Sequence, residues 1–289
     1  MRRVAVYLRP GDHLADQYLV SLLCSRWRDA GLEPVFLHDP ETCIEAEAAI
    51  VHVNLTRRPA AYDRLLDRYP LVINGGVRDI SKRRVSAQLV TRASGYAGPV
   101  IVKTDDNCFG APDWSGVAWS GGLTALVSRV AERVLPVRRR IRERRTYPIY
   151  PSADRVPRAV WWDPRLVVER FLPERRDGFY CLRTWVFFGP RGIASLSLSR
   201  EPVVKRVNVV ESEFVAEVPE AIREARARLG FDYGKFDFVI HEGRPILLDT
   251  NPTPTCGPKR TARLDAIADE LAPGLLELLA APPRRPPGA

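Results

Sequence analysis

Short apolar runs alternate with amphipathic segments along the first 75 residues, and this alternation limits the fold more than any other feature of the sequence. The runs RVAVYL, PVFLH, AIVHVNL and PLVING have the length and composition of strands. The segments between them predict helices from Leu14 to Gly31, over ETCIEAEA (41–48) and over PAAYDRLLDRY (59–69). Because strands that alternate with helices form a parallel sheet covered on both faces, we expect a doubly wound α/β domain over residues 1–79.

The second half of the chain is richer in strands, which predicts an α+β arrangement there. Its apolar runs are RLVVERFL, CLRTWVFF, GIASLSLS, FDFVIH and RPILLD, with a helix predicted at PEAIREARARLG. A basic helical segment over 79–92 and a loop rich in Gly, Pro, Trp and Ser over 111–122 lie between the halves, followed by a predicted helix over 123–135. The Pro-rich tail, 281–289, is expected to be disordered.

Bulk properties exclude several classes of protein. No apolar run approaches the roughly 18–20 residues that span a bilayer, and the first residues lack the apolar core of a signal peptide. The five cysteines have no metal-binding spacing, which favours reduced thiols and a cytoplasmic location. Cys108 and Cys256 are interpreted as small packing residues. The net charge is +9, and the arginine run 138–145 is interpreted as a solvated face, so a nucleic-acid partner is disfavoured.

The sharpest local pattern is a hairpin predicted over YGKFDFVIHEGRPILLDTN, residues 233–251. A three-residue turn over 242–244 gives a register in which Asp237 lies opposite Asp249, with Asn251 on the same face. Two facing carboxylates repel each other unless a cation lies between them. Oxygen ligands without His or Cys favour Mg²⁺, with Mn²⁺ as the alternative. A two-residue turn would instead put the two acids on opposite faces.

These motifs, in this order, resemble the ATP-grasp superfamily, in particular its carboxylate–amine or carboxylate–thiol ligases, such as the ribosomal-protein glutamate ligase and D-alanine–D-alanine ligase groups. That family ends its nucleotide site with an acid on one strand and acid-x-Asn on the next, as Asp237 and Asp249-Thr250-Asn251 do here. The resemblance spans roughly residues 80–255. It implies a two-lobed ATP-grasp fold after an N-terminal pre-ATP-grasp domain, with a central subdomain over 80–170 and a C-terminal subdomain over 171–280.

The resemblance also implies roles for individual residues. VIVKT resembles the phosphate-binding strand and SKRR the upstream lysine segment, while VVERFLPE resembles the hinge that contacts adenine. The implied ATP-binding residues are Lys82, Lys103, Glu169, Arg170, Phe171, Leu172 and Glu174. The implied residues that face phosphate or substrate are Arg183, Arg200 and Lys205. The implied metal ligands are Asp237, Asp249 and Asn251.

In function, the resemblance implies an ATP- and Mg²⁺-dependent ligase. Such an enzyme activates a carboxylate as an acyl phosphate, couples it to an amine or thiol, and releases ADP and phosphate. The substrate would be a small molecule, an amino acid or a peptide. A small-molecule kinase on the same scaffold and a non-catalytic ATP sensor stand as alternatives. The oligomeric state is open, with a homodimer as one option.

Overall fold

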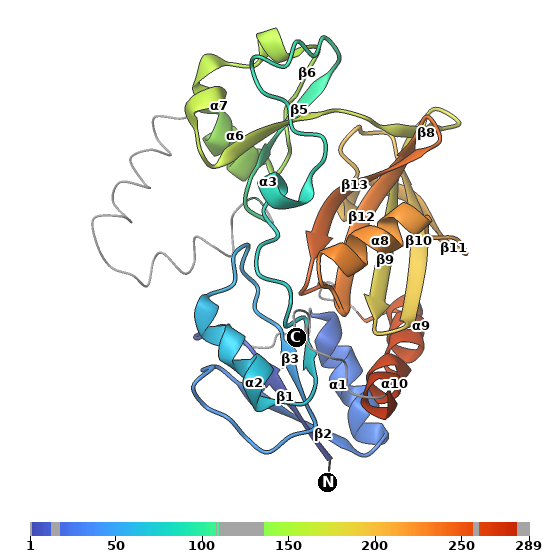
Figure 1. Cartoon of the computed structure of the whole chain (residues 1–289). Coiled ribbons are helices and arrows are strands. Elements are labelled where there is room, and N and C mark those ends of the chain that lie inside the picture. The colour runs from blue at the N-terminus through green and yellow to red at the C-terminus, as the bar shows by residue number, and fades with distance from the viewer. Residues whose placement is uncertain (1, 13–17, 108, 110–135, 257–259, 282–289) are drawn as a thin grey trace.

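The computed structural model describes residues 2–12, 18–107, 109, 136–256 and 260–281. Its N-terminal sheet lies at one end of the molecule, a small lobe built on the central strands lies at the other, and a large antiparallel sheet lies beside both (Figure 1). The cysteine, loop and helix predictions that fall on residues 108 and 111–135 lie outside the described part, as does nearly all of the tail. Within that part, no helix is long and apolar enough to cross a membrane.

The N-terminal sheet is parallel, with the order β2-β1-β3-β4. Its strands are β1 (Arg2–Tyr7), β2 (Leu32–Leu37), β3 (Ala48–Val51) and β4 (Val72–Ile73). One face packs on α1 (Leu19–Asp29), and the other packs on η1 (Ala60–Arg64) and α2 (Leu65–Arg68). The predicted parallel α/β architecture is therefore confirmed for this part of the chain.

Two of the predicted helices are wrong. Residues 41–47 form no helix, because two buried tyrosines bind the backbone there. Tyr7 Oη donates to the carbonyl of Thr42 at 2.9 Å, and Tyr69 Oη accepts from Ile44 N at 3.2 Å. The basic segment 79–92 contains only one helical turn, α3 (Lys82–Val85), since the chain beyond it runs along β7 and exchanges backbone hydrogen bonds with it.

The central lobe is a three-stranded antiparallel sheet with the order β6-β5-β7. Its elements are β5 (Val100–Thr104), α6 (Pro136–Arg144), β6 (Ile149–Tyr150), η3 (Ala153–Arg155), α7 (Arg158–Trp162) and β7 (Leu166–Arg170). Helix α6 buries Ile141 in the lobe's core. Arg138 is also buried and contacts Asp163, whereas the other arginines of the run 138–145 are exposed. The interpretation of that run as a solvated face holds for every arginine except Arg138.

The large sheet is antiparallel and has the order β11-β10-β9-β12-β13, with β8 paired to β9. Its elements are β8 (Glu174–Arg176), β9 (Phe179–Phe188), β10 (Arg191–Ser199), η4 (Arg206–Asn208), β11 (Val209–Val215), α8 (Glu220–Arg228), β12 (Tyr233–His241) and β13 (Arg244–Asn251). Five aromatic rings, Trp185, Phe187, Phe231, Phe236 and Phe238, form the core between this sheet and α8.

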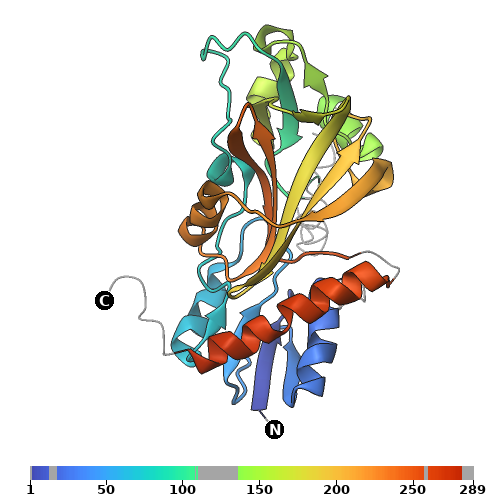
Figure 2. The ribbon, with the colours of Figure 1, turned by 90° about the vertical axis from the view of Figure 1, so that its right-hand side faces the viewer.

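The last two helices, α9 (Ala262–Leu271) and α10 (Pro273–Ala280), pack against α1 and complete the core of the N-terminal domain (Figure 2). Trp27 Nε1 donates to the carbonyl of Ala272 at 2.9 Å. Arg26 forms ion pairs with both Asp265 and Asp269. The packing therefore assigns these helices to the N-terminal core, although the sequence places them with the subdomain 171–280.

Asn74 joins the N-terminal domain to the large sheet. It follows β4 in a left-handed conformation, with φ of 60°, and is buried. Its side-chain amide donates to the carbonyl of Tyr233 and accepts from the backbone amides of Asp232 and Tyr233, while its own backbone amide donates to Asp232. These four hydrogen bonds fix the start of β12 against the N-terminal sheet.

Candidate functional site

A cleft lies between the central lobe and the large sheet, and its volume is about 810 Å³ when its open mouth is included. Its lining combines lysines, aspartates and apolar side chains: Lys82, Ile101, Lys103, Tyr147, Arg170, Phe171, Leu172, Pro173, Tyr180, Cys181, Leu182, Pro202, Val203, Val204, Asp237, Val239, Leu248 and Asp249. Seven predicted site residues therefore meet at one cleft, namely Lys82, Lys103, Arg170, Phe171, Leu172, Asp237 and Asp249.

The turn between β12 and β13 is not the predicted one. His241 lies directly opposite Arg244, so the turn contains two residues, 242–243, rather than three. Both turn residues have positive φ, +49° and +75°, which is the backbone of a tight two-residue hairpin turn. In a regular ladder this turn would place Asp249 on the opposite face from Asp237.

A β-bulge restores the predicted pairing. Phe238 lies opposite Leu247, whereas Asp237, the residue before Phe238, lies opposite Asp249. The register therefore shifts by one residue between Asp237 and Phe238. Leu248 is left unpaired, as expected for the extra residue of a bulge. Leu248 and Asp249 both line the cleft. The two aspartates therefore face each other as predicted, but a bulge in β13 and not a longer turn places them there.

Ammonium groups bind both carboxylates. Lys82 Nζ lies 3.0 Å from Asp249 Oδ1, and Lys235 Nζ lies 2.8 Å from Asp237 Oδ2. Thr184 Oγ1 donates to Asp237 Oδ1 at 2.8 Å. These contacts offset the repulsion between two carboxylates on adjacent strands.

The oxygen atoms present fit a magnesium ion. Asp249 Oδ2 has no hydrogen-bond partner in the described structure, and each oxygen of Asp237 has one partner and a further lone pair. Asn251 is on the same face, but it is not among the residues that line the cleft, and its Oδ1 accepts from both Thr253 N and Thr253 Oγ1. The described residues contain no group of three or more His, Cys, Asp or Glu around one point. The two carboxylates still suit Mg²⁺, which takes its other ligands from phosphates and water.

Lys82 and Lys103 are both buried, and each is bound to a carboxylate. Burial is the largest single effect and would lower the pKa of Lys82. The charge and hydrogen bond of Asp249, together with the charges of Tyr147 and Glu169, outweigh it, so the pKa lies above its ordinary value. Lys103 Nζ lies 2.7 Å from Glu169 Oε2. The other carboxylate oxygen, Glu169 Oε1, is buried without a hydrogen-bond partner in the described structure. Glu169 is not among the residues that line the cleft, although its neighbour Arg170 and its ion-pair partner Lys103 are.

The structure does not bring Arg183 and Glu174 into the cleft. Arg183 lies opposite Phe238 and its neighbour Thr184 lies opposite Asp237, so Arg183 projects from the other face of the sheet. Its guanidinium donates to both oxygens of Glu174 at 2.8–3.0 Å, which raises the pKa of Arg183. Neither residue is among those that line the cleft.

Arg200 and Lys205 follow β10 and also lie outside the cleft lining. Arg200 is exposed. Lys205 Nζ is 5.4 Å from the ring centroid of Phe109, and partial burial lowers its pKa. Cys256 is buried, and burial raises the pKa of its thiol, which agrees with a packing role and not with a reactive thiolate.

Comparison with known proteins identifies the fold. No family model matches the chain, and no curated protein sequence matches it. Two solved structures are similar over nearly the whole of both chains. D-cycloserine synthetase DcsG has a TM-score of 0.51 at 15% identity and covers 96% of this chain and 99% of that chain. The ATP-grasp ligase PsnB, solved with a minimal precursor, has a TM-score of 0.50 at 15% identity and covers 96% and 97%. This chain has the ATP-grasp fold.

Two residues that contact Asp237 were not predicted from the sequence, although strand alternation indicates one of them. Lys235 is two residues before Asp237 on β12, so both side chains lie on one face. Thr184 is identified only by the pairing of β9 with β12, and these strands are about fifty residues apart in the sequence. No local pattern predicts that pairing.

Proposed function

We propose that this chain is an ATP-dependent ligase that activates a carboxylate and joins it to an amine, with ADP and phosphate as products. The observation that carries the proposal is the pairing of Asp237 with Asp249 at the cleft that Lys82 and Lys103 also line. Two acids beside two buried ammonium groups, next to an apolar wall, match the needs of a nucleotide with its metal ion. The ATP-grasp fold agrees with this use of the cleft.

In the proposed complex, the base of ATP packs against the apolar residues around Phe171 and Leu172. The backbone from Arg170 onward binds its polar edge, and Glu169 Oε1 accepts from its amino group, since that oxygen has no other partner. Lys82 and Lys103 bind phosphate oxygens as compact point charges. Asp237, Asp249 and Asn251 would hold Mg²⁺, which supplies charge neutralisation at the phosphates.

The proposed reaction has two displacements. An oxygen of the substrate carboxylate attacks the γ-phosphorus, ADP leaves with the electrons of the broken P–O bond, and an acyl phosphate remains. The amine then attacks the acyl carbon, loses a proton and expels phosphate. Lys235, next to Asp237, is placed to bind the substrate carboxylate, while Arg200 and Lys205 are candidates for the outer phosphate. Such catalysis depends on position and charge and needs no protein nucleophile.

Arg183 and Glu174 enter the proposal in a changed role. Because they bind each other away from the cleft, we propose that they support the sheet behind the site. Glu174 Oε2 also accepts from Ile240 N at 2.6 Å, which connects β8 to β12, the strand that carries Asp237.

Incubation with ATP, Mg²⁺ and a panel of amino acids and peptides tests the proposal. A ligase releases phosphate and ADP only when both a carboxylate and an amine are present. Formation of a phosphorylated product without free phosphate identifies the kinase alternative, and ATP binding without turnover identifies the sensor. Asp237→Asn should abolish ADP formation, while Asp265→Asn, at an ion-paired aspartate of α9 that does not line the cleft, should not. Full turnover by Asp237→Asn would contradict the assignment of the metal site.

A further inference from the structure

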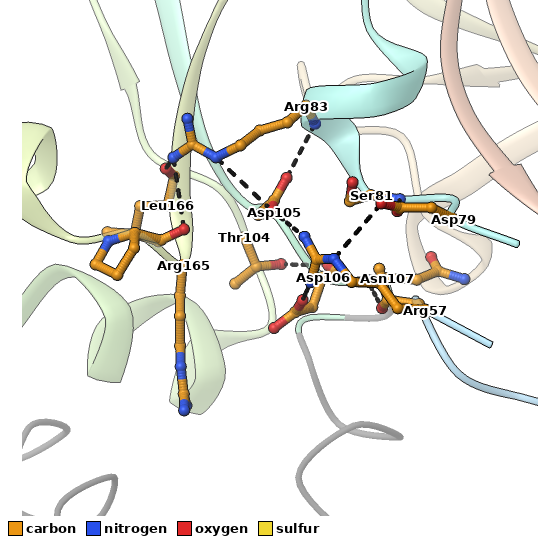
Figure 3. A network of polar contacts seen from close by, with 12 residues as sticks. Arg57, Asp79, Ser81, Arg83, Thr104, Asp105, Asp106, Asn107, Arg165 and Leu166 are labelled. Carbon is orange, nitrogen blue, oxygen red and sulfur yellow. Dashed lines mark hydrogen bonds and ion pairs between the residues drawn. The ribbon is translucent and has the colours of Figure 1, made fainter. Parts of the chain in front are cut away.

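Asp105 connects three segments of the chain beside the cleft. It follows β5 directly and is 2% exposed. Its Oδ1 accepts from the backbone amide of Arg83 at 2.9 Å, and its Oδ2 accepts from Arg57 Nη2 at 2.7 Å (Figure 3). Its carbonyl accepts from the backbone amide of Lys82 at 3.0 Å, and its own amide donates to Arg165 O at 2.8 Å. One residue thus binds the N-terminal domain, the turn α3 and the central lobe.

The turn α3 depends on Asp105 for its own structure. The first amide groups of a helix have no partner within the helix and need an acceptor from elsewhere. Ser81, at the N-cap of α3, makes no side-chain cap hydrogen bond. The carbonyl and carboxylate of Asp105 bind the first two amides of α3 instead. A one-turn helix has little stability of its own, so its position follows that of Asp105.

The position of α3 matters because it carries Lys82. Lys82 reaches the cleft from α3, whereas Lys103 reaches it from β5, two residues before Asp105. We propose that Asp105 is a positioning residue for nucleotide binding, because it holds the turn that carries Lys82 in a fixed place relative to Lys103. It thereby sets the spacing of the two ammonium groups that bind phosphate. This inference rests on the proposed function, since it takes the cleft to be a nucleotide site.

Arg57 compensates the buried charge of Asp105. A buried carboxylate needs a cation or several donors, and Arg57 supplies one from the N-terminal domain. The same guanidinium contacts Asp106 Oδ1 at 3.2 Å and Asp79 Oδ2 at 3.6 Å. Asp106 therefore shares Arg57 with Asp105, and its carbonyl accepts from Thr104 Oγ1 within the same segment. Asp106 is a matched control for the cap.

The test compares Asp105→Asn with Asp106→Asn in the full chain. Asparagine has the shape of aspartate, but its NH₂ group must face either Arg83 N or Arg57, which are both donors. Calorimetric titration with ATP and Mg²⁺ measures the Kd. We expect Asp105→Asn to raise it about tenfold, which corresponds to about 1.4 kcal/mol, and Asp106→Asn to leave it within about twofold.

Amine labelling gives a readout that a purely structural role would not move. In the wild type, Lys82 is buried and bound to Asp249, so an acylating reagent should label it slowly. Peptide mass spectrometry should show faster labelling of Lys82 in folded Asp105→Asn and no change in Asp106→Asn. A lower Tm with the Kd and the labelling unchanged would overturn the inference.

The two proposals can fail separately. If the wild type binds no ATP, the proposed function is wrong, and labelling of Lys82 still tests the placement of α3. If the wild type binds ATP and Asp105→Asn binds it equally well, the positioning role is wrong. Should Asp105→Asn not fold, Asp105→Glu keeps the charge but moves the acceptor away from Arg83 N. We expect it to raise the Kd at least about threefold, and an unchanged Kd would again overturn the inference.

Discussion

Replacement of Asp249 by Asn should destabilise the protein more than replacement of its partner Lys82 by Met. The two side chains are 3.0 Å apart but differ in burial, since Lys82 is 4% exposed and Asp249 is 35% exposed. Asp249→Asn leaves a buried ammonium group without its contacting carboxylate. Lys82→Met leaves a carboxylate that water can reach. The loss therefore depends on which partner is removed.

The magnitude follows from this asymmetry. Removal of one partner from a fully buried ion pair costs about 3–5 kcal/mol. The exposure of Asp249 weakens the pair, and Glu169 still acts on Lys82 at longer range. We therefore expect Asp249→Asn to lower the free energy of unfolding by about 2–3 kcal/mol. Lys82→Met should cost about 1 kcal/mol or less, because methionine fills similar space. The double variant should recover about 2 kcal/mol relative to Asp249→Asn.

Urea unfolding of the four proteins at pH 7 measures these differences, provided that the m-values agree. A pH series gives a second readout. In the wild type the pKa of Lys82 is raised, so the pair contributes fully below pH 10, near the pKa of an unfolded lysine. In Asp249→Asn, burial should outweigh the remaining charges of Tyr147 and Glu169 and lower the pKa of Lys82 below its unfolded value. The unfolded state then binds more protons, and the stability of the variant should rise from pH 7 towards pH 10. Equal losses in the two single variants, or an additive double variant, would refute this reasoning.

Three further predictions concern residues outside the ion pair. Asn74→Ala should cost about 2–4 kcal/mol in urea unfolding, because it removes side-chain hydrogen bonds and strains a φ of 60°; Asn74→Gly should recover only the part due to φ. Burial lowers the pKa of His52 to about 3, so stability should fall as pH drops below about 6.5, and His52→Phe should be less acid-sensitive by about 2 kcal/mol at pH 5. Glu242→Asn should raise stability by about 0.5 kcal/mol, since Asn tolerates positive φ before Gly243, measured as a higher Tm.

Most strands could be predicted from the sequence because they are short apolar runs, and the alternation of the first four with helices specifies a parallel sheet. Strands β6, β8 and β11 were not predicted, because β6 and β8 are very short and β11 is largely exposed. The helix predicted over 41–48 fails for a non-local reason. Its backbone groups bind the phenols of Tyr7 and Tyr69, and nothing within the segment itself indicates those partners. A local pattern cannot compete with hydrogen bonds from buried side chains far away in the sequence.

The same limit separates the predicted site residues that meet at the cleft from those that do not. Lys82, Lys103 and the hinge reach it because each stands next to a strand or turn that the pattern identifies. Arg183 does not reach the cleft, because the face of the sheet on which its side chain lies depends on the register of β9 against β12. A shift of one residue in that register would exchange Arg183 and Thr184 between the two faces. No short turn joins β9 to β12 in the sequence, so no local pattern sets the register of these two strands.

In the hairpin, two errors of the sequence-based prediction cancel: the predicted turn is one residue too long, and the bulge in β13 was not predicted. A two-residue turn and a three-residue turn differ by one residue in register, and one bulge has the same effect. The adjacent apolar residues Leu247 and Leu248 indicate the bulge. In a strictly alternating strand Leu247 and Asp249 would lie on the same face, so Leu247 could not be in the core while Asp249 faced the cleft. Leu247 lies opposite the core residue Phe238, while Leu248 lines the cleft. Deletion of Leu248 should therefore keep Asp237 opposite Asp249 in a regular ladder while it removes one apolar side chain from the cleft. The variant should retain the ion pair of Lys82 but bind ATP more weakly, and loss of the slow labelling of Lys82 would show that the bulge is needed to place the aspartate.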